Sequence, residues 1–157
     1  MIHRMLLAVD DTVDALAATR VALELARGPG RTLRVVHAGA QPALVEALRR
    51  GSTHPGAAAR SDRAGAAVLD RVEAMARAAR VDVGTALLAG EPGHAVLDEA
   101  RRWSADLVVV GKSSRSASGE PYVGPVTRHI LEFSEQPVLV VPASGGPGRG
   151  PRVMPSS

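Results

Sequence analysis

Asp106-Leu-Val-Val-Val-Gly111 and Pro137-Val-Leu-Val-Val-Pro142 are two short apolar runs in the last third of the chain, separated by a polar loop and a segment of helical character. A run that is apolar on both faces is typical of a central strand in a parallel sheet. Where such a strand ends on a glycine and a polar loop leads into a helix, backbone amides and the helix N-terminus can hold a phosphate. This stretch therefore predicts an α/β fold and makes nucleotide binding the first functional hypothesis.

The rest of the chain alternates in the same way between apolar runs and segments of helical periodicity. Alternation of this kind predicts a parallel sheet with right-handed crossovers and helices on both faces. The predicted strands cover residues 4–10, 32–38, 81–88, 107–110 and 138–141, and the predicted helices cover 12–27, 61–80, a segment after Pro92 that carries residues 95–100, and 124–135.

The apolar stripe of the first predicted helix is formed by Val13, Leu16, Ala17, Val21, Leu23 and Leu25. Residues 39–60 give a weak signal. Residues 143–157 are rich in Gly, Pro and Ser, and we expect a disordered tail there after one domain over residues 1–142.

Composition limits the class of protein. A chain of 157 residues fits one domain, and with one Phe, one Trp and one Tyr its core must be built from Ala, Val and Leu. The absence of cysteine excludes disulfides and thiolate metal sites. The short apolar run at the N-terminus is not typical of a signal peptide, and no segment reaches the roughly 20 apolar residues of a membrane span. We therefore expect a cytoplasmic protein.

Charged and metal-binding residues give little sign of further partners. The net charge is +3, but arginines are interleaved with Asp and Glu, which is typical of solvated helix faces and argues against nucleic-acid binding. The histidines lie far apart in sequence, without an i, i+4 pair or acidic companions at metal-ligand spacing, so we expect no metal site in the protein. These are His3, His37, His54, His94 and His129.

Taken together, several motifs make the chain resemble a universal stress protein from about Arg4 to Pro142. The motifs are Leu6-Leu-Ala-Val-Asp10, Val35-Val-His37, Gly90-Glu-Pro92, the strand ending at Gly111, and Gly124 leading to Pro137-Val-Leu-Val-Val-Pro142. The resemblance implies a Rossmann-like fold of the adenine nucleotide alpha hydrolase type, a single domain with a five-stranded parallel sheet of order 3-2-1-4-5. It also implies a homodimer that pairs through the last strand, Val138, Leu139, Val140 and Val141.

The resemblance further implies an adenine nucleotide site between the first and fourth strands. Nucleotide-binding members carry G-x2-G-x9-G-[S/T], whose positions fall here on Gly111, Ser114, Gly124 and Pro125, so the second and fourth positions depart from the pattern. Lys112 and the serines of the loop favour an anion, although the same residues are also typical of a solvated loop.

Two more positions correspond to the nucleoside part of the ligand. The resemblance places Asp10 over the adenosine and Ala38 beside adenine. Asp10 has an alternative role, since it could equally cap the helix that follows it.

Two functions from different classes follow. The first is a stress-response regulator that binds ATP or AMP, with Mg²⁺ held through the phosphates, and hydrolyses ATP slowly at most because no general base is evident. The alternative is a dimeric adaptor of the same family that has lost nucleotide binding, favoured by Ser114 and Pro125. A third, enzymatic interpretation is autophosphorylation on Ser113 or Ser116.

Overall fold

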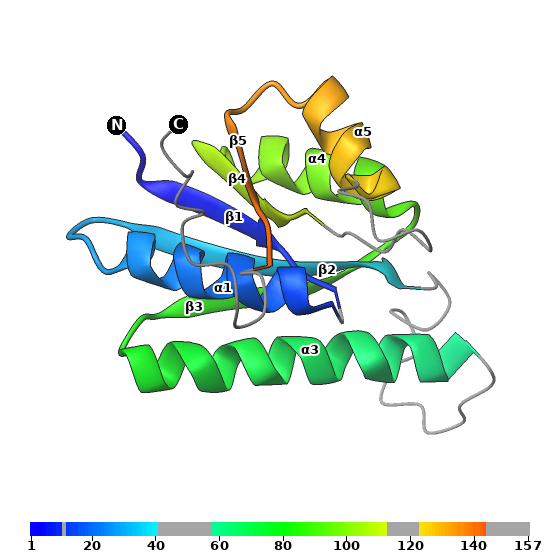
Figure 1. Ribbon diagram of the computed structural model, residues 1–157, viewed down its shortest axis with the longest axis horizontal. Helices are drawn as coiled ribbons and strands as arrows, with labels where there is room; N and C mark the ends of the chain where they lie inside the picture. Colours follow the sequence, from blue (N-terminus) through cyan, green and yellow to red (C-terminus); the bar gives the residue numbers. More distant parts are fainter. Residues whose placement is uncertain (11, 41–57, 113–122, 144–157) are drawn as a thin grey trace, which may run out of the picture.

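Five short apolar segments form one parallel sheet in the computed structural model, which describes residues 1–10, 12–40, 58–112 and 123–143 (Figure 1). The strands are β1 (Arg4–Ala8), β2 (Thr32–Ala40), β3 (Val83–Ala89), β4 (Leu107–Gly111) and β5 (Val138–Val141). Their order is β3-β2-β1-β4-β5, so the predicted order 3-2-1-4-5 is confirmed. All four strand pairs are parallel, which places every carboxyl end at the same edge of the sheet.

Helices cover both faces of this sheet. They are α1 (Val13–Ala26), α3 (Ala58–Ala79), α4 (Pro92–Arg102) and α5 (Pro125–Phe133). Figure 1 shows α1 and α3 on one side and α4 and α5 on the other. None of the helices in the described part of the chain is long and apolar enough to cross a membrane.

Successive residues of the central strands divide between two apolar cores because side chains alternate along a strand. Leu7 of β1 and Val109 of β4 belong to the core shared with α1 and α3. Leu6 and Val108 belong to the core shared with α4 and α5. With both faces buried, these strands are apolar at every position after the exposed Arg4, which is the pattern that the sequence analysis recognised.

Local sequence explains where two of the helices begin. The Thr12 hydroxyl accepts a hydrogen bond from the Ala15 N–H at 3.2 Å and so caps α1. Glu91 caps α4 in the same way, and Pro92 occupies the first helical position, where its missing N–H has no helical partner to lose.

The predicted apolar stripe of α1 is partly wrong. Val13 is 70% exposed, whereas Ala15, Ala18, Thr19 and Ala22 are buried. The helix lies so close to the sheet that small side chains fill the contact. The prediction relied mainly on the larger apolar residues of the helix and therefore missed the buried alanines. Several boundaries also differ from the prediction. The strand β1 ends at Ala8, β2 continues to Ala40 through a bulge, α3 begins at Ala58, β3 covers Val83–Ala89 and α5 ends at Phe133.

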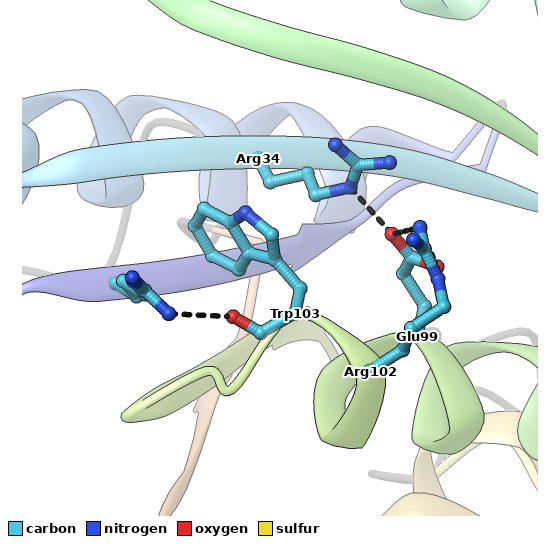
Figure 2. A network of polar contacts seen from close by, with 5 residues as sticks. Arg34, Glu99, Arg102 and Trp103 are labelled. Atoms are coloured by element: carbon cyan, nitrogen blue, oxygen red, sulfur yellow. Dashed lines mark hydrogen bonds and ion pairs between the residues drawn. The ribbon is translucent and has the colours of Figure 1, made fainter.

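A buried carboxylate attaches α4 to the sheet, although the charged residues of the chain were expected on solvated faces. The Glu99 side chain is only 5% exposed, and its Oε1 lies 2.6 Å from Arg34 Nε on β2. Arg102, one turn further along α4, donates to both Glu99 oxygens at 2.6 and 2.7 Å. The contact with Arg34 is an ion pair by distance without the alignment of a hydrogen bond. Figure 2 shows this network with Trp103 beside it, where the Trp103 carbonyl accepts from Arg4 at 3.3 Å.

Replacing Glu99 is expected to destabilise the fold. Glu99→Ala leaves Arg34 and Arg102 facing each other without a carboxylate, and we expect the free energy of unfolding to fall by about 2 kcal/mol. Asp98→Ala removes a neighbouring carboxylate that is 75% exposed and paired with Arg101, and should cost less than about 0.5 kcal/mol. Urea denaturation of both variants measures the difference. Equal stabilities would mean that the buried pair does not anchor α4.

Candidate functional site

A cavity of about 220 Å³ lies where the carboxyl ends of β1 and β4 meet the N-termini of α4 and α5. The chain leaves β1 for the face covered by α1 and leaves β4 for the opposite face, so the strand order reverses here, and this is where sheets of this class bind ligands. The lining residues are Ala8, Val9, Asp10, Ala15, Ala38, Pro92, Val96, Val110, Gly111, Pro125, Val126, Thr127 and Ile130.

Four of the site residues predicted from the sequence line this cavity: Asp10, Ala38, Gly111 and Pro125. Two other predicted site residues, Lys112 and Gly124, lie beside the cavity without lining it. The Gly124 N–H donates to the Lys112 carbonyl at 3.0 Å, so both backbones are tied together where the loop returns to α5. The predicted phosphate contact Ser114 falls outside the described residues, as do Ser113 and Ser116.

Gly111 is required by a close contact between β4 and α1. A Cβ at this position would lie 2.8 Å from the Asp14 carbonyl carbon and 2.9 Å from the Ala15 nitrogen. Backbone atoms at that distance cannot give way as a flexible side chain would. The Gly111 carbonyl also accepts a hydrogen bond from the Thr127 hydroxyl at 2.8 Å, which ties the end of β4 to the first turn of α5.

Gly111→Ala is therefore expected to destabilise the protein by about 2 kcal/mol, because α1 and β4 must move apart. Gly84→Ala in β3 is the matched control, since a Cβ there meets nothing within 4 Å. Thermal melts followed by circular dichroism compare the two variants. An unchanged melting temperature for Gly111→Ala would contradict the close contact.

Asp10 does not cap α1, which corrects the alternative role that the sequence analysis gave it, but it supports the capping residue and lines the cavity. Its carboxylate accepts hydrogen bonds from the Thr12 N–H at 3.0 Å and from the Thr12 hydroxyl. Thr12 in turn caps α1, so Asp10 orients the cap rather than capping the helix itself. A carboxylate has about four acceptor sites, which leaves capacity for a hydroxyl group of a ligand.

The N-terminus of α5 differs from those of α1 and α4 because no side chain caps it. Its N-cap residue is Gly124, and Pro125 at the first helical position has no N–H. Val126 and Thr127, the next two residues, line the cavity. The Thr127 hydroxyl is already bonded to Gly111, so the groups offered to a ligand are backbone amides and the positive end of the helix dipole.

The apolar walls of the cavity were not predicted. Pro92 and Val96 of α4 and Val126 and Ile130 of α5 form them, and in the sequence these residues look like ordinary core positions. Thr127 is the lining residue that the sequence could have revealed, because it is polar and lies in the first turn of a helix beside a strand end.

A second cavity of about 370 Å³ lies between α1 and α3 and shares Asp10 with the first. It is larger, but the N-terminus of α1 that borders it is already capped by Thr12. Arg71 of α3 offers this cavity a guanidinium, but none of its lining residues comes from β4, so it does not lie at the reversal of strand order, and the cavity at the strand ends is the better candidate site.

Two of the histidines are not as isolated as the sequence indicated. His94 Nδ1 lies 3.1 Å from Glu91 Oε2, and the His94 and His129 rings meet edge to face with centroids 4.6 Å apart. The expectation that these histidines lack an acidic companion is therefore wrong, because Glu91 precedes His94 by one helical turn. Hydrogen bonds from the His94 and Gly93 backbone amides hold the pKa of Glu91 below its usual value.

Comparison with known proteins agrees with this geometry. The sequence matches the model of the Universal stress protein family over residues 1–142. The chain belongs to this family. The protein described as "Universal stress protein in QAH/OAS sulfhydrylase 3′region" of Thermus aquaticus is 32% identical over 148 residues, 90% of this chain and 99% of that protein. Universal stress protein YxiE of Bacillus subtilis is 26% identical over 147 residues, with the same coverage.

Solved structures of universal stress proteins share the fold. One from Archaeoglobus fulgidus in complex with dAMP has a TM-score of 0.66 at 22% identity, covering 90% of this chain and 99% of that chain. One from Arabidopsis thaliana with AMP bound has a TM-score of 0.64 at 16% identity, covering 90% and 92%. A third, in complex with cAMP, has a TM-score of 0.63 at 21% identity, covering 91% and 98%. At these identities the similarity establishes the fold.

Proposed function

We propose that this universal stress protein binds an adenine nucleotide, AMP or ATP, in the cavity between β1 and β4 and acts as a cytoplasmic stress-response regulator. The observation that carries the proposal is the uncapped N-terminus of α5, which opens into the cavity beside Gly111. A helix end without a side-chain cap is a ready site for a phosphate. Three proteins of the same fold that carry dAMP, cAMP or AMP support this choice of ligand.

The residues around the cavity suit the separate parts of a nucleotide. Ala38 and the apolar wall provide a surface for the adenine ring, and Asp10 accepts hydrogen bonds from ribose hydroxyls. The Val126 and Thr127 amides face the phosphates, and Lys112 and Ser114 contribute from the loop after β4. Mg²⁺ is held through the phosphates, because Asp10 is the one carboxylate among the described residues that line the cavity.

Pro125 weakens this arrangement without abolishing it. It supplies neither a hydroxyl nor an N–H, so one hydrogen bond to a phosphate oxygen is lost. A hydrogen bond to a charged group contributes about 1.5–3 kcal/mol, which corresponds to at least a tenfold lower affinity than with Ser or Thr at this position.

Filling the cavity beside the proposed position of the adenine ring should weaken nucleotide binding. In isothermal titration calorimetry with AMP, ADP and ATP, with and without Mg²⁺, we expect binding by the native protein and at least a tenfold loss for Ala38→Leu. Ala89→Leu is the matched control, since Ala89 is exposed at the end of the neighbouring strand β3 and does not line the cavity. Equal affinities for the two variants would place the nucleotide elsewhere.

The alternative function, a dimeric adaptor without nucleotide, is favoured by the departures at Ser114 and Pro125. Native mass spectrometry of the freshly purified protein separates the two functions. A co-purified adenine nucleotide supports the regulator. No bound nucleotide, together with no heat on titration, contradicts nucleotide binding and leaves the adaptor. Any ATP hydrolysis is expected to be slow.

We also propose that two copies pair through β5, which lies at the edge of the sheet. The Val108 N–H donates to the Pro137 carbonyl and the Lys112 N–H donates to the Val141 carbonyl. Because backbone groups alternate in direction along a strand, those of Val138 and Val140 point away from β4. These groups are available to a second copy, and a two-fold dimer is the commonest closed assembly.

Val140→Pro removes one outward N–H and should shift the protein toward the monomer. Analytical ultracentrifugation of the native protein should give twice the chain mass of 16.2 kDa. Val140→Thr keeps the N–H and should remain dimeric. A monomeric native protein, or a Val140→Pro variant that dimerises as well as the native one, would contradict the proposed interface.

A further inference from the structure

The contact between α4 and α5 brings together three side chains that can bind a metal ion. Glu91 and His94 lie one turn apart at the start of α4, and His129 comes from α5. Each offers one ligand atom, and the three atoms lie within 4.8 Å of one another. The cluster borders a surface hollow on the α4–α5 contact, whereas the nucleotide cavity is lined by other residues of the same helices.

His129 is held in position by its surroundings. Its ring fits against Gly93, where a Cβ would come within 2.6 Å of His129 Cδ2. On its other sides the ring contacts His94 edge to face and Phe133 at a centroid distance of 4.7 Å. His129 Nε2 is buried and has no hydrogen-bond partner within the described part of the chain. A buried polar group without a partner is unfavourable, so the position favours a ligand that binds the free nitrogen of the ring.

We propose that Glu91, His94 and His129 bind one divalent transition metal ion, with Zn²⁺ the best match. Two imidazoles and a carboxylate are a common ligand set for zinc, and a water molecule completes the tetrahedron. This reverses the sequence-based expectation that the protein has no metal site.

Small movements are enough to close the site. Ligand atoms about 2.1 Å from zinc lie about 3.4 Å apart in a tetrahedron, so the widest separation in the cluster must shrink by roughly 1.4 Å. The His94 side chain is 69% exposed and can rotate toward the His129 ring, while the Glu91 carboxylate stays in place as the cap of α4.

Glu91 can bind the metal and still cap α4. Its Oε1 accepts from the Gly93 N–H at 3.1 Å and its Oε2 from the His94 N–H at 2.8 Å. A carboxylate oxygen has two acceptor sites, so each oxygen keeps one for a metal ion. The metal therefore joins the first turn of α4 to α5 without removing the cap.

The proposal predicts one zinc ion per chain. Competition for Zn²⁺ against a chromophoric chelator is measured on the full chain, without an affinity tag and without nucleotide. We expect a stoichiometry of one and at least a tenfold loss of affinity in His94→Gln, whose exposed side chain can be replaced without disturbing the fold. His3→Gln removes a histidine at the far end of the sheet and should bind zinc like the native protein. The Co²⁺ form should show visible absorption of a four- or five-coordinate ion, which His94→Gln loses.

Thermal stability provides a second test of the proposed zinc site. Zn²⁺ should raise the melting temperature of the native protein and of His3→Gln but not that of His94→Gln, because a metal bound only to the folded state stabilises it. Native protein that binds no zinc, or a His94→Gln variant with native affinity, would overturn the site. Neither result bears on nucleotide binding, which is measured separately.

Discussion

The close approach of the α1 backbone to Gly111 is the contact on which the candidate site depends. The α1 residues facing the sheet are mostly alanines, so the helix lies close enough for Asp14 and Ala15 to touch the end of β4. The Asp14 carboxylate also accepts a hydrogen bond from the Ala143 N–H, just beyond β5. One turn of α1 thus fixes the ends of β4 and β5, and a larger residue at position 111 would disturb all of these elements.

On the opposite face a similar contact sets the distance between α4 and α5. Gly93 lies against the His129 ring as Gly111 lies against α1, and in both places the absence of a Cβ allows two elements to approach. The α4–α5 contact has two results. It brings the apolar walls of the cavity between β1 and β4 together on one side, and it places His129 beside Glu91 and His94 on the other.

The fold was predictable because each central strand is buried on both faces and each helix has a periodic pattern, so the element order follows from local sequence. Asp10 and Gly111 were also predictable as neighbours, because both follow or end strands whose carboxyl ends meet at one edge of the sheet, whereas Ala38 and Pro125 were assigned through the family resemblance. The buried face of α1 was not predictable. Alanines form the buried face of a helix only where the helix packs very close to the sheet, and the sequence of the helix does not give that distance. The proximity of His129 to Glu91 was missed because it depends on tertiary packing between residues far apart in sequence.

The first turn of α5 determines what kind of recognition the cavity can provide. Pro125 fixes the backbone for the helix, and the Thr127 hydroxyl is engaged with Gly111, so no side chain on this turn is left to select among phosphate groups. What remains are backbone amides and the helix dipole, which attract negative charge of any form. In the proposed complex, discrimination between nucleotides would therefore come from the opposite side of the cavity, where Asp10 and Ala38 lie. Under this proposal, phosphate binding contributes affinity, and the residues at the ends of β1 and β2 contribute selectivity.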